Sequence, residues 1–273
     1  MAVMNAVRPP AQAFMPQPPE RRIEGHGTPD AAWQAWGGIA AMPAIDVATL
    51  APPGGRAIVV APHPDDEVLA CGGLLQLLQA QGTRTVLLAV TDGDASHPGS
   101  MLLPPDALAR MRPQETLAAL RVLGMGADAG AVPPQVLRAR IADGRVGANI
   151  EQLQTLLHQL LHPADTVFVT WRLDGHPDHE ACGLAAAMAA RACGARLVEM
   201  PVWTWHWAAP GDKRVPWQRA RRLDLSPEVM QRKRQAVACF ATQLENDPST
   251  GQPAILPPHV LARLLHPYEI YFT

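Results

Sequence analysis

Two short segments concentrate side chains that can bind a metal ion and move protons. The first is Pro-His-Pro-Asp-Asp-Glu at residues 62–67, and the second is Gly-His-Pro-Asp-His at residues 175–179. In both, a histidine (His63 and His176) directly precedes a proline. A residue before proline favours an extended backbone, and proline suits the first position of a helix. Each segment therefore predicts a strand-to-helix corner with a histidine on it.

Two imidazoles and one carboxylate are enough for a catalytic zinc site. His63, Asp66 and His179 would supply this set and leave a fourth position open for water. Asp65 and His176 would remain beside the metal as acid and base groups. The sequence thus predicts one Zn²⁺ per chain.

A structural interpretation of either segment is also possible. A lone His-Pro-Asp can be a helix N-cap with an acid near the positive end of the helix dipole. The presence of both segments in one chain favours the metal site. The three adjacent acids at residues 65–67 also favour it, because they repel one another unless a cation is present.

Buried strands are expected to position both segments. Residues 57–61 and 166–171 are continuous apolar runs, typical of strands buried on both faces of a parallel sheet. Further strands are predicted at 85–91, 196–203 and 269–272, and helices at 67–80, in a stretch ending at 116–124, and at 148–162, 179–193, 227–243 and 258–265. The alternation predicts an α/β fold with a mostly parallel sheet and helices on both faces. Ligands bind at the carboxyl ends of the strands in such sheets, where both segments fall.

Composition limits the class of protein. The chain has 273 residues, of which 48% are hydrophobic, enough for a sizeable core in one large domain or two small ones. The net charge of −2 offers no basic surplus, so no nucleic-acid partner is expected. The four cysteines form no Cys-x-x-Cys pair, which argues against a disulfide framework or a zinc knuckle. Neither an integral membrane segment nor a secretory signal is recognised, so a cytoplasmic protein is expected.

The N-terminal region differs from the rest in its proline content. Several of the 28 prolines fall before residue 20, and residues 1–27 are expected to form an extended arm. Trp33 and Trp36 have helical spacing, so a short helix within residues 29–41 is expected to dock on the main body. The sequence predicts an arm with a docking helix over residues 1–55 and a catalytic domain over residues 56–273.

The paired segments carry a family resemblance. VVAPHPDDEVLACGGLL (59–75) followed by GHPDHEACG (175–183) resembles the PIG-L/LmbE-like zinc-dependent N-acetylglucosaminyl deacetylase family, over roughly residues 55–272. This resemblance implies a Rossmann-like sheet and an enzyme that acts on an amino-sugar substrate. By motif it implies zinc ligands His63, Asp66 and His179, Asp65 as the general base, His176 as the oxyanion-stabilising and proton-handling histidine, and Asp178 as the acid that orients and charges a histidine.

Three more polar residues are candidates for substrate binding. The resemblance implies an Arg-x-x-Glu on the second helix with the arginine near substrate, and Arg112 and Glu115 have this spacing. Pro113 between them is expected to break or restart the helix. The resemblance also suggests Asp143, in a loop near the sugar. Asp92 either forms an Asp-Gly turn or supports the metal site or the substrate.

Tryptophans 203, 205 and 207 alternate along a segment that is expected to be extended, which would place all three on one side. Packing in the core is the favoured role for them. The alternative is one indole stacked under a sugar ring.

The function predicted is a zinc-dependent hydrolase that removes the N-acetyl group from an N-acetylglucosamine-type sugar or its conjugate. Zinc would acidify a water, Asp65 would take its proton, and zinc and protonated His176 would stabilise the oxyanion. Alternatives are a zinc amidase acting on another N-acyl or sugar-conjugate amide, and a non-catalytic sugar- or nucleotide-binding module. The first strand is followed by Pro-His-Pro-Asp-Asp-Glu rather than a G-x-G-x-x-G turn, which argues against a dinucleotide site. The oligomeric state is not predicted.

Overall fold

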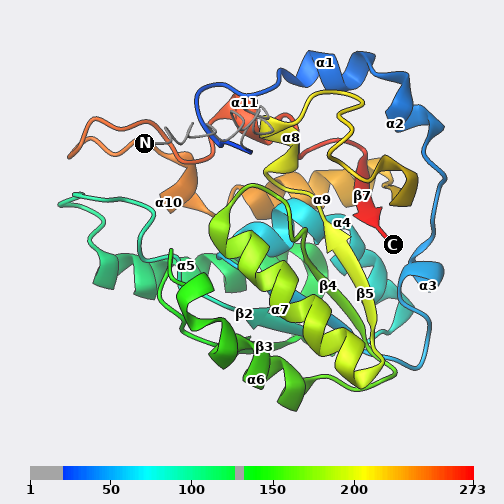
Figure 1. The fold of residues 1–273 in the computed structure, drawn as a ribbon. Coiled ribbons are helices and arrows are strands. Elements are labelled where there is room, and N and C mark those ends of the chain that lie inside the picture. The colour runs from blue at the N-terminus through cyan, green and yellow to red at the C-terminus, as the bar shows by residue number, and fades with distance from the viewer. Residues whose placement is uncertain (1–20, 127–131) are drawn as a thin grey trace, which may run out of the picture.

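A single mixed sheet forms the centre of the fold. The computed structural model describes residues 21–126 and 132–273, and in these residues seven strands pair in the order β3-β2-β1-β4-β5-β7-β6 (Figure 1). The strands are β1 (Ala57–Ala61), β2 (Thr85–Ala89), β3 (Gln135–Arg138), β4 (Thr166–Thr170), β5 (Arg196–Met200), β6 (Ala220–Asp224) and β7 (Tyr268–Phe272). The first five run parallel, and β7 is antiparallel to both β5 and β6. The predicted α/β fold with a Rossmann-like, mostly parallel sheet is confirmed.

Helices cover both faces of this sheet (Figure 1). Those that the site depends on are α4 (Asp66–Gln81), α5 (Pro105–Leu120), α6 (Ile150–Leu160), α7 (Pro177–Cys193) and α9 (Pro227–Val237). Successive side chains of a strand point to opposite faces. Accordingly, Ile58 and Val60 of β1 pack with α6 and α7, whereas Val59 packs with α4, α5 and α9. The sheet is therefore buried on both faces, as its continuous apolar strands predicted.

Two strands were not predicted, and one predicted helix is divided. β3 and β6 carry polar and partly exposed residues, so they lack the apolar run by which the other strands are recognised. The helix predicted at 227–243 consists of α9 and a separate turn, α10 (Ala241–Leu244). The remaining short helices are α1 (Asp30–Ala35), α2 (Gly37–Ala41), α3 (Val47–Leu50), α8 (Thr204–Trp207) and α11 (Pro258–Leu261).

The prediction that Pro113 breaks or restarts its helix is wrong, because α5 runs through this residue. Proline lacks the N–H that would bond to the carbonyl of Ala109, four residues earlier. Arg138 of β3 donates to this carbonyl instead, with 3.4 Å between Nη2 and the oxygen. The neighbouring strand thus partly replaces the missing hydrogen bond, and Arg112 stays on a helix.

A buried ion pair supports α4, the helix that begins at Asp66. The backbone of α4 leaves the helical region at Cys71 (φ −143°), which frees amide groups in the following turn. The Glu269 carboxylate accepts from the Gly73 and Leu74 amides at 2.7 and 2.9 Å, and from Lys233 Nζ at 2.7 Å. This carboxylate of β7 therefore closes the break in α4.

Two short helices, α1 and α2, replace the single docking helix expected within residues 29–41. Trp33 of α1 is 1% exposed, and its indole nitrogen donates to the Trp205 carbonyl at 2.9 Å. Beyond α2, Ala44 forms a parallel bridge with Arg222 of β6. Residues 21–55 are thus packed on the sheet domain, while most of the predicted arm, residues 1–20, lies outside the described residues. The boundary at residue 55 stays a prediction.

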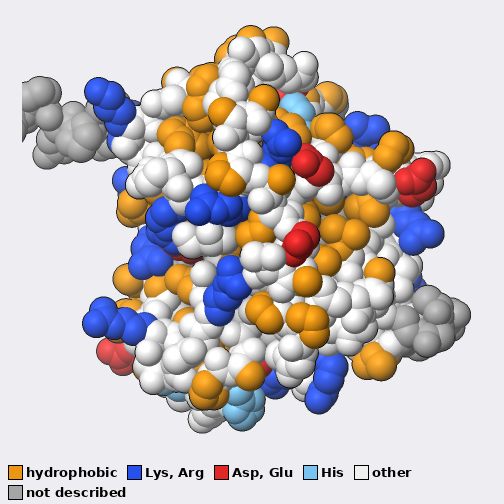
Figure 2. Space-filling model, turned by 90° about the vertical axis from the view of Figure 1, so that its right-hand side faces the viewer, with side chains coloured by type: hydrophobic (Ala, Val, Ile, Leu, Met, Phe, Trp, Pro, Cys, Tyr) orange, Lys and Arg blue, Asp and Glu red, His pale blue; other side chains and the backbone are white. Residues whose placement is uncertain are grey.

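Figure 2 shows one face of the molecule, where lysine and arginine side chains are interspersed with apolar ones and a few acids. None of the described helices combines the length and the apolar composition needed to cross a bilayer.

Candidate active site

The two predicted segments meet where the strand order reverses. β1 and β4 are neighbours, while the chain progresses from β1 towards β3 on one side and from β4 towards β5 on the other. Loops that follow such a pair of strands diverge and leave a crevice between them. The rings of His63, after β1, and His176, after β4, lie 4.8 Å apart between centroids, and His179 is 5.3 Å from His63. The fold therefore brings the paired motifs together.

The three predicted zinc ligands lie together, with one nitrogen of each histidine close to the same oxygen of Asp66. Asp66 Oδ2 lies 3.2 Å from His63 Nδ1 and 3.2 Å from His179 Nε2. His179 is fully buried, yet its Nε2 makes no hydrogen bond, so its contact with Asp66 lacks the alignment of one. A buried imidazole nitrogen without a hydrogen bond, facing a carboxylate, is the donor arrangement that a metal ion would complete. The residues present therefore fit a zinc ion.

Each of these histidines is held through its other nitrogen by carboxylates. His179 Nδ1 lies 2.9 Å from Asp174 Oδ2. His63 Nε2 lies 3.3 Å from Asp178 Oδ2 and 3.2 Å from Asp143 Oδ1. Metal-binding histidines usually donate their second N–H to a carboxylate, which fixes the ring and its tautomer. The histidine that the Asp178 carboxylate contacts is thus His63.

Two further groupings could hold an ion. Potential ligand atoms lie within 4.8 Å of one another in the set His63, His176 and His179, and in the set His63, Asp143 and Asp178. His63 belongs to both, so its two ring nitrogens face two different groups of donors. The assignment of Asp66 as the third ligand remains a prediction.

Asp174 is a residue that the sequence analysis missed. It is fully buried and accepts hydrogen bonds from the backbone amides of Val202, Trp203 and Thr204, each at 2.9 Å. These bonds anchor the helical turn α8, so the predictions that the strand reaches residue 203 and that the segment from Trp203 to Trp207 is extended are wrong. Asp174 lies directly before the segment at residues 175–179, but the amides that donate to it lie about 30 residues further along the chain.

Asp65, the predicted base, has an unusual backbone and a perturbed carboxyl. Its φ of 139° is rare for a non-glycine residue, and such strain is often found at functional sites. Burial raises the pKa of the Asp65 carboxyl to about 8, although Arg112 opposes this shift. Arg112 Nη2 donates to Asp65 Oδ2 at 3.0 Å. The buried Asp65 carboxyl therefore binds a proton more tightly than an ordinary aspartate.

Arg112 is 2% exposed, and its guanidinium hydrogen-bonds to the protein rather than to solvent. Besides Asp65, its guanidinium donates to the carbonyls of Pro64 and Gly93 at 2.8 and 2.9 Å. Gly93 has a φ of +68°, and a Cβ there would lie 2.1 Å from Arg112 Nη1. The Asp-Gly turn after β2 thus gives Arg112 room. The predicted contact of Arg112 with substrate remains a prediction.

His176 is held as a neutral ring. Burial and the adjacent His179 and His63 lower the pKa of His176 to about 3. Its Nδ1 accepts from the Asp178 amide at 3.2 Å, so in a neutral ring the proton is on Nε2. His176 is therefore placed to donate a hydrogen bond from Nε2, and its predicted role as a charged group remains a prediction.

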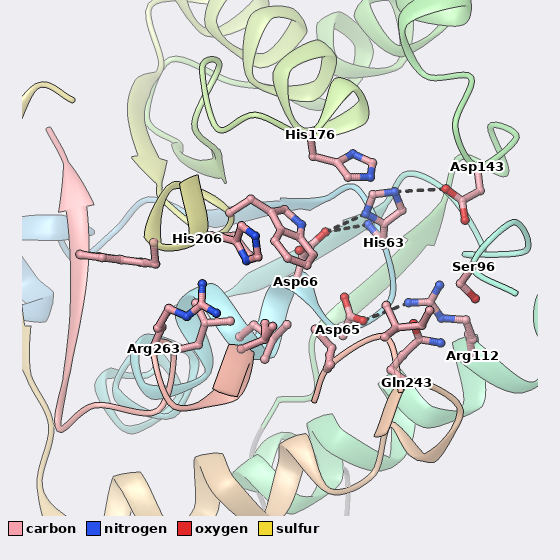
Figure 3. A pocket seen from close by; sticks show the side chains of 18 of the residues that line it. His63, Asp65, Asp66, Ser96, Arg112, Asp143, His176, His206, Gln243 and Arg263 are labelled. Atoms are coloured by element: carbon pink, nitrogen blue, oxygen red, sulfur yellow. Dashed lines mark hydrogen bonds and ion pairs between the residues drawn. The ribbon is translucent and has the colours of Figure 1, made fainter. Parts of the chain in front are cut away.

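A cavity of about 300 Å³ opens beside these residues. Figure 3 shows Ser96, Arg112 and Asp143 on one side of Asp65 and His63, and His206 and Arg263 on the opposite side. Of the predicted site residues, His63, Asp65, Asp66, Arg112, Asp143 and His176 line the cavity. Asp92 is not among its lining residues and pairs with Arg138 at 2.7 Å.

The sequence analysis missed several residues that line the cavity: Ser96, His206, Gln243 and Arg263. These four come from loops and short helices with no recognisable motif, so nothing in the sequence distinguished them. Trp203 and Trp205 also line the cavity, whereas Trp207 does not.

The comparisons with known proteins agree with this architecture. The family model described as PIG-L: GlcNAc-PI de-N-acetylase matches residues 58–190, which include both histidine segments. The predicted resemblance to the PIG-L/LmbE-like family is thereby confirmed. A search of curated protein sequences found no match.

Several solved structures share the fold. The N,N′-diacetylchitobiose deacetylase from Pyrococcus horikoshii is 18% identical, with 74% of this chain and 76% of that chain covered and a TM-score of 0.55. A zinc-inhibited teicoplanin deacetylase is 20% identical, with 69% and 84% covered and a TM-score of 0.51. A deacetylase of the A40926 pseudoaglycone is 24% identical, with 70% and 83% covered and a TM-score of 0.51. At these identities the likeness shows the fold alone.

Proposed function

We propose that the protein is a zinc-dependent hydrolase that removes the N-acetyl group from an amino sugar or its conjugate. The observation that carries this proposal is the convergence of His63 Nδ1 and His179 Nε2 on Asp66 Oδ2 in a crevice that also holds Asp65. The PIG-L match and the names of the solved deacetylases support acetylated sugars and glycoconjugates as substrates.

The ligand residues would be His63, Asp66 and His179, with one ion per chain. Zinc held there would supply a Lewis acid for the amide carbonyl and lower the pKa of a water. Asp174, Asp143 and Asp178 keep the two imidazoles in place through their second nitrogens.

The other residues would carry the proton transfers and the developing charge. Asp65 takes a proton from the attacking water, and Arg112 fixes the orientation of its carboxylate. His176 donates a hydrogen bond from Nε2 to the oxygen that becomes negative as water adds to the carbonyl. The carbon–nitrogen bond then breaks, Asp65 returns the proton to the leaving amine, and acetate and the free amino sugar are released.

Acetate release tests this proposal. The purified protein is treated with a chelator, reloaded with zinc, and incubated with N-acetylglucosamine or N,N′-diacetylchitobiose. We expect acetate and a free amine only after zinc is restored. Sugar binding without acetate release from either substrate would favour the non-catalytic binding module instead.

A further inference from the structure

The cavity has an apolar half that removal of an acetyl group does not require. Five apolar side chains line it, here called the apolar arm: Leu69, Val202, Trp205, Val260 and Leu264. Each is at most 8% exposed, so these five side chains are buried. Leu69, Trp205 and Leu264 also line a small neighbouring cavity, so these three lie close together. An acetyl group offers one methyl group to such a surface, and sugar hydroxyls would lose their hydrogen bonds there.

The opposite half of the cavity is polar and suits a sugar. Ser96, Arg112, Asp143 and Gln243, here called the polar arm, lie together on one side of the histidines (Figure 3). Hydroxyl groups need fixed donors and acceptors of this kind. The two arms therefore differ in the chemistry that each would accept.

The position of Asp65 decides which end of an amide enters which arm. The proton that Asp65 returns must reach the leaving nitrogen, so the amine lies on the side of Asp65 and its partner Arg112. That side is the polar arm. The acyl group must point the other way, past Asp66 towards Leu69, which lies about one turn further along α4.

We propose that the apolar arm binds the acyl chain of the substrate, and that the preferred N-acyl groups are neutral chains several carbons longer than acetyl. This inference rests on the proposed function and names its substrate class more closely. Trp205 donates its indole N–H to the Pro201 carbonyl at 3.2 Å, which leaves the apolar ring for the chain. His206 and Arg263 close the far end of the arm (Figure 3).

A series of N-acylglucosamines tests the proposal: acetyl, butyryl, hexanoyl and octanoyl, with adipoyl as a chain that ends in a carboxylate. Dissociation constants are measured by calorimetry on the zinc-loaded Asp65→Asn protein, and kcat/KM on the zinc-loaded wild type. We expect binding to tighten from acetyl to hexanoyl by about fourfold for each methylene that the arm buries. Binding that stays constant or weakens with chain length would overturn the proposal. So would a gain confined to adipoyl, which would assign the arm to an anion at Arg263.

Two variants of the arm should shift the length preference in opposite directions. Val260→Phe fills the arm and should reduce the ratio of hexanoyl to acetyl kcat/KM by at least tenfold. Leu264→Ala enlarges the arm and should move the optimum to a longer chain. Loss of folding cannot produce opposite shifts, and the exposed Val132→Phe is the matched control, for which we expect an unchanged ratio. Equal length profiles in all three proteins would contradict the assignment.

The outcomes separate the two proposals. Acetate release with no gain for longer chains leaves the proposed function intact and refutes the acyl arm. An absence of hydrolysis for every acyl group refutes the proposed function, and the dissociation constants still decide whether the arm binds the chain.

Discussion

Asp174 Oδ2 lies 2.9 Å from His179 Nδ1, and both side chains are fully buried. The same carboxylate accepts three backbone amides of the loop that leads into α8. One side chain therefore orients a predicted metal ligand and anchors a wall of the cavity. We expect Asp174→Asn to weaken zinc binding by about 10–100-fold, because loss of a carboxylate behind a ligand histidine typically does so. Competition with a chromogenic chelator measures this, and the exposed Asp224→Asn is the control. Unchanged zinc affinity in Asp174→Asn would contradict the role assigned to His179.

Substitution of Asp65 and of Asp66 should distinguish the general base from the metal ligand. Asp65→Asn should keep its zinc and lose about 10²–10⁴-fold in kcat, because a general base is removed without removing a ligand. Asp66→Asn should lose zinc. Elemental analysis and single-substrate kinetics of both variants check this. The reverse pattern would exchange the two roles.

Arg112 should act through Asp65. Arg112→Ala should lower kcat by about 10²-fold, since a displaced catalytic group costs about this much. Arg112→Lys should restore little of the lost kcat. A lysine ammonium group cannot reproduce the planar guanidinium, which donates to Pro64, Gly93 and Asp65 at the same time. Gly93→Ala should lower kcat as well, because its Cβ would displace the guanidinium. A rise in KM alone would instead assign Arg112 to a substrate hydroxyl, as the sequence analysis expected.

Metal removal should make stability depend on pH in a defined window. Burial opposes protonation of His179, but the Asp66 and Asp174 carboxylates raise the pKa of His179 to about 9. Burial raises the pKa of Asp65 to about 8. Both groups bind a proton more tightly in the folded than in the unfolded chain, so stability is lost as pH rises through the folded pKa values. The Asp65 contribution is lost between about pH 4 and 8 and the His179 contribution between about pH 6.5 and 9, so we expect the free energy of unfolding of the chelator-treated protein to fall most steeply between about pH 6.5 and 8. His179→Ala should flatten this slope in urea titrations, whereas an equally steep slope would locate its origin elsewhere.

The buried Lys233–Glu269 pair should support α4. Lys233→Met leaves the Glu269 carboxylate buried with fewer donors, and breaking such a pair costs about 3–5 kcal/mol. Thermal unfolding measures this, with the exposed Arg234→Met on the same helix as the control. The Tyr271 hydroxyl also donates to Glu269 Oε2, at 2.7 Å. Equal midpoints for the two variants would show that this hydroxyl and the Gly73 and Leu74 amides satisfy the carboxylate without Lys233.

The sequence predicted those parts of the fold and site that depend on local signals. Continuous apolar runs identified β1 and β4, and the His-Pro pairs identified the corners at His63 and His176. Asp174, His206 and Arg263 were not predicted as site residues, because they reach the site only through contacts between segments distant in the chain. The continuous helix through Pro113 could not be predicted, because the carbonyl of Ala109 bonds to Arg138 of a neighbouring strand, which no local pattern reveals.

The residues that line the cavity come from two parts of the chain, one inside and one after the region that the family model matches. The predicted ligands and base lie within residues 58–190, the region that the family model matches, but of the apolar arm only Leu69 does. Val202, Trp205, Val260 and Leu264 all follow that region. If the apolar arm binds the acyl chain, as proposed, acyl preference can diverge in evolution while the predicted ligands stay the same, since these four residues of the arm lie in the last third of the chain. Relatives that share only the matched region would then share the predicted ligands while differing in the acyl groups they accept.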